Sequence, residues 1–311
     1  MKKLALALVT VLLFLGYSNK VVAQYYFYND SYYDKDVIYE LGGSTGVMNC
    51  LTDIGGKAGI GKKFVKDLNY GNTSSNFGAY LSVIYKNAIG FRLEACFGKI
   101  SGDDAVLSAV PETDIARTRF NRNLNFQTNI TEFSATAEIY PLFLFINWEN
   151  KDAEPPRYSP YLLGGVGYFS FNPQALYNNK LIDLQPLSTE GQGLKEYPDR
   201  KPYQLKQINF PVGGGLKYEL SSLVNLRAEF VYRILSTDYL DDVSTNYIDP
   251  TTFVANGFNG TKLSNALILN NRVINGQRAL PGNKRGSPTQ KDSYFTFNIK
   301  VGLALGKERI R

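Results

Sequence analysis

The chain contains no histidine, only two cysteines and a single tryptophan. Without histidine, a Ser-His or Cys-His nucleophile pair is excluded, and the commonest transition-metal ligand is missing. Beyond residue 23, no stretch offers the roughly 18 consecutive apolar residues of a membrane-spanning helix, so we expect no inner-membrane span. We therefore expect a protein that is not an enzyme, with no catalytic or metal site, no cofactor and no small-molecule substrate.

Residues 1–23 have the composition of a signal peptide. Lys2 and Lys3 precede the apolar run Leu4–Leu15, and Val21-Val22-Ala23 is a small-residue cleavage site ahead of Gln24. A membrane-anchoring helix is the alternative, but the run is too short to span a bilayer. No cysteine stands at the cleavage point, so a lipoprotein is not expected. The sequence predicts export, with cleavage after Ala23.

The charge of the exported chain is nearly balanced. Removing three of the 34 basic residues with the signal peptide leaves 31 against 28 acidic residues. This small excess gives no reason to expect a nucleic-acid partner. The next residues, 24–36, form a tyrosine-rich lead-in, read either as a mobile tail at the membrane interface or as a periplasmic docking segment.

Two stretches alternate bulky apolar residues with polar or charged ones, one for one. In 89–97 the apolar side is Ile89, Phe91, Leu93, Ala95 and Phe97; in 226–234 it is Leu226, Ala228, Phe230, Tyr232 and Ile234. A period of two indicates β-strands, and each apolar face is about the length that a tilted strand needs to cross a bilayer. The same alternation recurs in 124–140 and 293–305.

From residue 37 onward we predict eight strands, at 37–50, 76–85, 89–100, 124–140, 161–172, 205–220, 225–237 and 293–305. The odd-numbered connections, 51–75, 101–123, 173–204 and 238–292, are long and polar, whereas 86–88 and 221–224 are short. Long loops on one side and short turns on the other are typical of outer-membrane barrels. Residues 37–311 are therefore expected to be all-β: a closed antiparallel eight-stranded transmembrane β-barrel with long extracellular loops and short periplasmic turns. Its outward residues are expected to include Phe91, Leu93, Phe133, Ile139, Phe230, Phe295, Phe297 and Ile299.

The inward faces of these strands carry charges of both signs. Paired carboxylates can act in catalysis, but inward arginines and lysines are as numerous, so we expect a neutralised structural network. Its predicted members are Arg92, Glu94, Glu132, Glu138, Lys217, Glu219, Arg227, Glu229 and Arg233. Because eight strands leave just enough room for side chains, we expect a filled lumen and no diffusion pore.

The hairpin between the sixth and seventh strands can be given a register from its charges. A three-residue turn at Ser222–Val224 places Glu219 opposite Arg227 and Lys217 opposite Glu229. A shift of two residues instead places Lys217 opposite Arg227. Opposite charges favour the first register.

Three further features have a structural interpretation and a functional one. Asp238, Asp241 and Asp242 can be read as a Ca²⁺ site, but their spacing favours a solvated rim. Gly213-Gly214-Gly215 lies within a strand and is not followed by a helix, so it is not a phosphate loop. Cys50 and Cys96 lie on strands that are not neighbours; a disulfide is possible in an oxidising compartment, but two separate thiols are expected.

The connection 141–160 is the exception among the short turns, since it contains the apolar run Leu142–Ile146 and then Trp148. We expect it to form a periplasmic flap. Exposed apolar and aromatic residues beyond the needs of a turn favour a docking surface. The candidate docking residues on this flap and on the lead-in are Tyr25, Tyr26, Leu142, Phe143, Phe145 and Trp148.

Several strings resemble the PorG-type outer-membrane barrels of the type IX secretion system. They are Thr237–Thr245 (TDYLDDVST), Leu184–Gly193 (LQPLSTEGQG), Arg122–Phe126, Pro211–Tyr218 and Asn49–Gly56. The first two are the more specific, and the matches run in family order from about residue 37 to the C-terminus. Cys50 stands where this family is expected to have an aromatic residue.

The resemblance implies a non-enzymatic part in protein secretion across the outer membrane, alongside periplasmic ring proteins, in which the barrel is not itself the conduit. Outer-membrane lipids are the other expected partner. The alternative from a different class is a small surface adhesin or a passive outer-membrane barrel.

Overall fold

The structure is a computed structural model that describes residues 36–57, 59, 70–145, 156–221, 223–274 and 277–305. The expected signal peptide, residues 24–35 of the expected lead-in and Trp148 lie outside the described residues. Within them, no helix is long and apolar enough to cross a membrane.

Eight strands form one closed antiparallel barrel, which confirms the predicted fold class. Each strand pairs with its neighbour around the wall, and β3 returns to β4 to close it, so that the barrel has no free edge. The barrel strands are β1 (Val37–Leu51), β2 (Ser74–Tyr85), β3 (Ile89–Asp103), β4 (Asn125–Ile139), β5 (Tyr158–Ser170), β8 (Lys206–Glu219), β9 (Val224–Leu235) and β10 (Ser293–Leu305).

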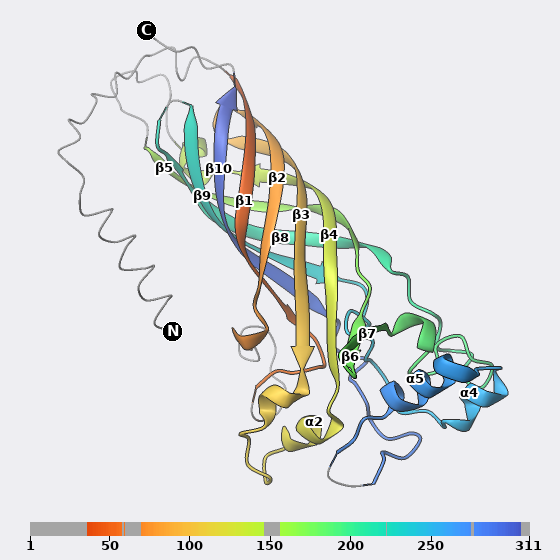
Figure 1. The fold of residues 1–311 in the computed structure, drawn as a ribbon. Coiled ribbons are helices and arrows are strands. Elements are labelled where there is room, and N and C mark those ends of the chain that lie inside the picture. The colour runs from red at the N-terminus through yellow and green to blue at the C-terminus, as the bar shows by residue number, and fades with distance from the viewer. Residues whose placement is uncertain are drawn as a thin grey trace.

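The ends of the barrel differ as the connection lengths predict. The first strand starts and the last strand ends beside the short turns 86–88 and 220–223, because Val37 pairs with Tyr85 and Leu303 with Val224. By the rule for outer-membrane barrels, this is the periplasmic end. The long loops and their short elements gather at the opposite, outer end (Figure 1).

Most predicted outward side chains are exposed, as a lipid-facing surface requires. Phe91, Leu93, Phe133, Ile139, Phe297 and Ile299 are between 40% and 58% exposed. Phe230 and Phe295 differ: Phe230 is half-buried and Phe295 is buried, and their rings pack against each other at 5.6 Å between centroids. This pairing shields the two rings near the outer end.

The predicted register between β8 and β9 is wrong. Lys217 lies opposite Arg227, and Glu219 lies opposite Asn225, which is the alternative register shifted by two residues. The four residues 220–223 connect the strands, and the N–H groups of Leu220 and Ser221 both donate to the carbonyl of Val224.

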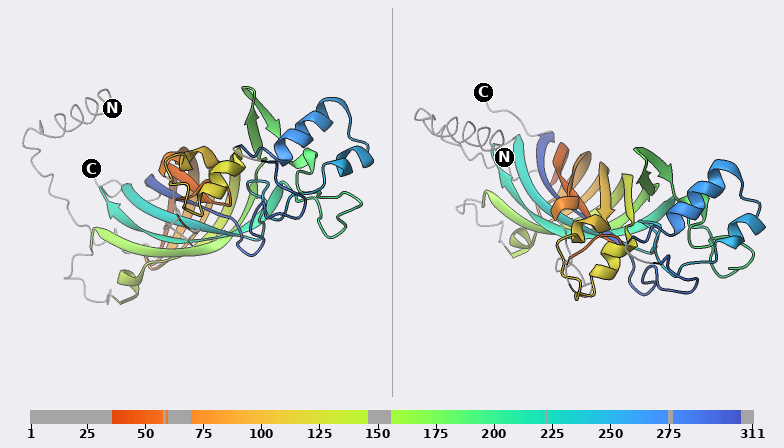
Figure 2. Two further views of the ribbon diagram at one scale, coloured as in Figure 1. Left: turned by 90° about the horizontal axis from the view of Figure 1, so that it is seen from below. Right: turned by 60° about the horizontal axis from the view of Figure 1, so that its bottom comes forward.

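The outer loops fold into a compact cap with elements of its own. A hairpin inside the third long loop, β6 (Gln174–Tyr177) and β7 (Lys180–Asp183), turns through Asn178 and Asn179, both at positive φ as this tight turn requires. The hairpin and the last two helices stand to one side of the barrel mouth (Figure 2). The remaining elements are η3 (Tyr70–Asn72), η4 (Asp104–Leu107), α2 (Arg117–Arg122), η5 (Gln185–Leu187), α4 (Thr251–Ala255) and α5 (Gly260–Asn270), with α3 (Pro141–Phe145) at the periplasmic end.

A continuous apolar core joins the cap to the outer half of the lumen. It includes Met48 of β1 and Phe169 of β5 together with Leu187, Leu240 and Phe253 of the loops. The loops therefore pack on the barrel interior, and burial of this surface stabilises the cap.

Candidate functional site

A buried cluster of mostly apolar side chains closes the lumen toward its periplasmic end. Phe143 of α3 packs there, so the short helix contributes to the closure. The other members of this buried cluster are Ile38, Ile84, Ala88, Tyr140, Tyr161, Leu163, Val231 and Ala304.

Charged side chains fill the middle of the lumen. Arg92 contacts three carboxylates, with N–O distances of 2.7 Å to Glu229, 3.0 Å to Glu138 and 3.3 Å to Glu94. Lys300 bridges Glu94 and Glu229 at 2.6 and 2.8 Å. These groups are almost completely buried, so each charge depends on its partners for stabilisation.

Glu40 explains the register between β8 and β9. Its carboxylate lies 3.2 Å from the Lys217 ammonium and 2.7 Å from the Arg227 guanidinium, which also contacts Glu138 at 3.2 Å. The like charges of Lys217 and Arg227 are therefore held side by side by an anion from β1. The central network has four cations and four carboxylates, so it is neutral when all are ionised.

Two tyrosine hydroxyls donate further hydrogen bonds to these carboxylates. The Tyr80 hydroxyl donates to Glu40 at 2.6 Å, and the Tyr161 hydroxyl donates to Glu229 at 2.7 Å. Arg92, Arg227 and Lys300 lie over the Tyr80 ring at 5.3–5.7 Å from its centroid. Tyr80 is thus a central packing residue of the network.

A separate pair lies nearer the outer end. Arg233 binds Glu132 at 3.1 Å and donates to Thr296 at 2.6 Å. Glu132 also accepts a hydrogen bond from the Tyr294 hydroxyl. Above this pair begins the apolar core shared with the cap.

The structure brings together most of the inward charges named from the sequence. Arg92, Glu94, Glu138, Lys217, Arg227 and Glu229 belong to the central network, and Glu132 and Arg233 to the outer pair. Glu219 is half-buried at the periplasmic end of β8. Glu40 and Lys300 were not among the predicted members of the network. Glu40 lies in a glycine-rich strand whose facing is ambiguous in the sequence. The alternation of 293–305 does place Lys300 inward, so its membership could have been predicted.

The candidate docking residues divide by burial. Phe143 is buried and Leu142 half-buried, whereas Phe145 is 87% exposed and its neighbour Leu144 51%. Tyr25, Tyr26 and Trp148 lie outside the described residues. Only the end of α3 therefore presents a described apolar surface in this region.

The cap contains a second polar cluster. Its residues lie in strings that resemble PorG-type barrels, but contacts between these strings were not predicted from the sequence. The Glu190 carboxylate accepts hydrogen bonds from the N–H groups of Ser244 and Thr245, at 3.1 and 2.8 Å, and pairs with Arg285 at 2.9 Å. Asp242 accepts from the hydroxyls of Thr189 and Tyr203. The LQPLSTEGQG and TDYLDDVST strings thus meet in one buried contact, here called the loop junction.

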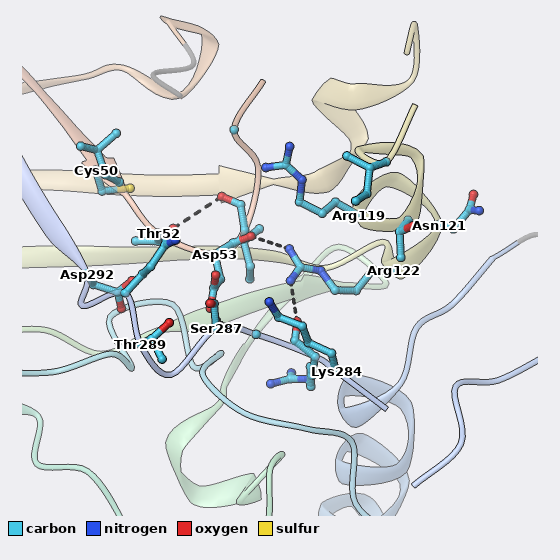
Figure 3. A pocket seen from close by; sticks show the side chains of 18 of the residues that line it. Cys50, Thr52, Asp53, Arg119, Asn121, Arg122, Lys284, Ser287, Thr289 and Asp292 are labelled. Carbon is cyan, nitrogen blue, oxygen red and sulfur yellow. Dashed lines mark hydrogen bonds between the residues drawn. The ribbon is translucent and has the colours of Figure 1, made fainter. Parts of the chain in front are cut away.

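Arg122 ties two further strings to this junction. It pairs with Asp104 through two hydrogen bonds of 2.8 Å. It also donates to the carbonyls of Arg285 and Asp53, at 2.7 and 2.6 Å (Figure 3). Arg122 begins the Arg122–Phe126 string, and Asp53 lies in Asn49–Gly56. Four of the five family-like strings therefore converge around two buried arginines.

The expectation of a solvated aspartate rim is wrong. Asp238, Asp241 and Asp242 are at most 3% exposed because the first, third and fourth long loops cover them. Burial raises the pKa of Asp242 to about 6 and that of Asp238 to about 7. Among the described residues, no group of three metal-ligating side chains forms a metal site.

A cavity of about 1250 Å³ lies beside the loop junction (Figure 3). Its walls come from the end of β1, from α2 and from residues 277–293, and they include Asp53, Arg122 and Asp292. Cys50 also lines it, and its thiol donates to the carbonyl of Ser101 at 3.7 Å. Cys50 and Cys96 are free thiols, as expected.

No protein-family model and no curated protein matches the chain. Among solved structures, it is similar to Neisserial surface protein A, with 10% identity, a TM-score of 0.34 and coverage of 86% of this chain and 99% of that one. It is also similar to the outer membrane protein OprG from Pseudomonas aeruginosa, with 13% identity, a TM-score of 0.35 and coverage of 87% and 96%.

A major outer membrane protein from Thermus thermophilus is similar too, with 10% identity, a TM-score of 0.36 and coverage of 87% of this chain and 100% of that one. Likenesses at such low identity concern the fold alone. Closure of the sheet, the exposed apolar exterior and the loop asymmetry give this chain the fold of an outer-membrane β-barrel.

Proposed function

We propose that the protein is a non-enzymatic outer-membrane component of a protein secretion apparatus of type IX, docking on periplasmic ring proteins. The observation that carries the proposal is the loop junction. Four strings that resemble PorG-type barrels converge there through Arg122, Glu190, Asp242 and Arg285. The resemblance therefore falls on residues that depend on one another in the fold.

The filled lumen supports a role other than conduit. Apolar residues occupy its two ends, and a neutral charge network occupies its middle. A passive solute pore is disfavoured, since a solute must displace buried ion pairs whose separation costs several kcal/mol.

The periplasmic end offers a surface for a partner. Leu144 and Phe145, which are neighbours on α3, are 51% and 87% exposed. Exposed apolar side chains outside the strand belt are typical of interaction sites. We propose that α3 contacts a periplasmic ring subunit.

Secretion by cells that carry altered barrels tests this function. Removal of the gene is expected to abolish cargo export, and Leu144→Ser with Phe145→Ser to reduce it while the barrel still folds, as judged by heat-modifiable gel mobility. Leu220→Ser, which changes an exposed residue of another turn, is the matched control. Normal export without the gene contradicts the proposal.

A surface adhesin is the remaining candidate, favoured by the compact, folded cap. It predicts the opposite pattern: export continues without the gene, and binding of cells to host surfaces is lost.

A further inference from the structure

Three loop segments of the cap are held together by two buried aspartates, Asp241 and Asp292, and one half-buried aspartate, Asp53. Asp241 accepts from the N–H of Ile54 at 2.9 Å, which ties the 238–244 segment to the first loop. Asp53 accepts from the N–H of Ser287 at 2.7 Å, and Asp292 accepts from the N–H of Leu240 at 2.8 Å. Each segment is thus fastened to a neighbour by one aspartate.

These aspartates lie close enough to interact with one another. Asp241 binds the N–H of Ile54, the neighbour of Asp53, and Asp292 binds the N–H of Leu240, the neighbour of Asp241, so these carboxyl groups gather in one cluster. Within it, the charges of Asp241 and Asp238 help to raise the pKa of Asp292. Glu190 adds a further negative charge near Asp53 and Asp238. Asp238, at 3% exposed, accepts from the Ser244 hydroxyl through one oxygen, while its other oxygen has no partner among the described residues.

The cations that face this cluster do not neutralise it fully. Arg122 faces Asp53 and Asp241, but its strongest contact is the pair with Asp104. Arg285 is likewise bound to Glu190. Lys284 faces Asp53 and Lys291 faces Asp238, yet neither forms an ion pair within 4 Å of a carboxylate in the described parts of the chain.

The electrostatic consequence has a definite sign. Burial raises the pKa of Asp53, Asp241 and Asp292, and raises that of Asp238 to about 7. A carboxyl whose pKa is raised by folding binds protons more tightly in the folded cap. For Asp238, the stability that proton binding adds to the folded cap is fully present below its pKa in the unfolded chain, near 4. That stability is lost as the pH rises through about 7.

We propose that Asp53, Asp238, Asp241 and Asp292 form a pH-sensitive latch: protonation removes the repulsion between these carboxyl groups in acid, so that their hydrogen bonds hold the three loop segments together, and repulsion between the ionised groups loosens the segments in alkali. Because Asp53 and Asp292 also line the 1250 Å³ cavity, loosening widens the opening of that cavity to the outside. This inference is independent of the secretion role.

Distances between spin labels test the latch in the full-length barrel. Lys57→Cys and Gln290→Cys place labels on the first and last of the three segments, in a background of Cys50→Ala and Cys96→Ala. We expect a narrow distance distribution at pH 5 that broadens and shifts to longer distances by pH 9. A second pair at Lys180 and Val254, on the cap but outside the cluster, is expected to stay unchanged.

Asparagine variants identify the responsible groups. Asp238→Asn with Asp292→Asn keeps an oxygen for each observed hydrogen bond and removes two of the four ionisable groups, so the broadening at pH 9 is expected to be clearly smaller than in the wild type. Asp249→Asn, which changes a half-buried carboxyl of the same loop outside the cluster, is expected to retain the wild-type response. Distributions of the first pair that are identical at pH 5 and pH 9 overturn the proposal without any variant, and so does an unaltered response in the double variant.

Discussion

Lys217 and Arg227 lie directly opposite each other on β8 and β9, and the carboxylate of Glu40 lies between them at 3.2 and 2.7 Å. Two like charges opposed on neighbouring strands are unfavourable on their own. In this barrel the pairing holds because β1 supplies the anion across the lumen. The register is therefore a property of several strands and not of one hairpin.

Loss of the Glu40 charge is expected to destabilise the barrel strongly. Glu40→Gln leaves Lys217 without its carboxylate and Arg227 with only Glu138, and an uncompensated buried charge costs about 3–5 kcal/mol. Urea titration followed by heat-modifiable mobility measures the change. Glu219→Gln is the comparison. Glu219 is half-buried at the periplasmic end of β8, outside the central network, so its replacement is expected to lower the free energy of unfolding less.

The same network predicts a partial rescue. Adding Lys217→Met to Glu40→Gln removes one cation with the missing anion, so the double variant is expected to be more stable than Glu40→Gln alone. If the double variant loses as much free energy of unfolding as the two single variants together, Glu40 and Lys217 do not balance each other's charge.

Arg92 is expected to resist replacement even by lysine. Its guanidinium reaches Glu94, Glu138 and Glu229 at once, whereas an ammonium on a flexible stem does not reproduce this planar geometry. Arg92→Lys is expected to cost about 1.5–3 kcal/mol, the value of one lost hydrogen bond to a charged group. An Arg92→Lys barrel with unchanged urea midpoint contradicts this role.

Two adjacent glycines of β5 are expected to respond differently to alanine. A Cβ at Gly165 collides with the carbonyl oxygen of Ala135 and lies 2.7 Å from the Cα of Thr136, and these backbone atoms cannot move aside easily. A Cβ at Gly164 meets nothing within 4 Å. Gly165→Ala is expected to lower stability by about 1–3 kcal/mol through overpacking, whereas Gly164→Ala leaves it almost unchanged. Equal unfolding midpoints contradict the close approach of β4 and β5.

Glu190 is expected to stabilise the folded loops of the cap but not to be needed for folding of the barrel. Glu190→Gln removes the charge that neutralises buried Arg285, so the loops become sensitive to protease while heat-modifiable mobility is retained. Asp199→Asn, an exposed change in the same loop, is the control. Loss of barrel folding in Glu190→Gln shows instead that cap and barrel form one cooperative unit.

Alternation made the barrel strands predictable, because lipid on one side and packed side chains on the other impose a period of two. It also placed Lys300 on the inward face of β10, while its neighbours Ile299 and Val301 are exposed on the outward face. It failed at Glu40, since small residues at Gly42, Gly43 and Gly46 hide the facing of β1. The register failed for a related reason: charge pairing was applied to two strands, while the deciding anion lies on a third.

The cap was less predictable, because its contacts join residues far apart in the chain. Asp238, Asp241 and Asp242 look like surface residues in the sequence and become buried only when the first and third long loops fold over them. The Asn178-Asn179 pair was a local signal for the β6–β7 hairpin that sequence reasoning did not use.

We propose that this barrel works as a docking component of a secretion apparatus. Affinity purification of the tagged barrel from gently solubilised outer membranes tests it most directly, with the Leu144→Ser and Phe145→Ser barrel run in parallel. We expect the wild-type barrel to bring down the periplasmic ring subunits and the variant to bring down fewer of them. A wild-type barrel recovered without ring subunits contradicts the account.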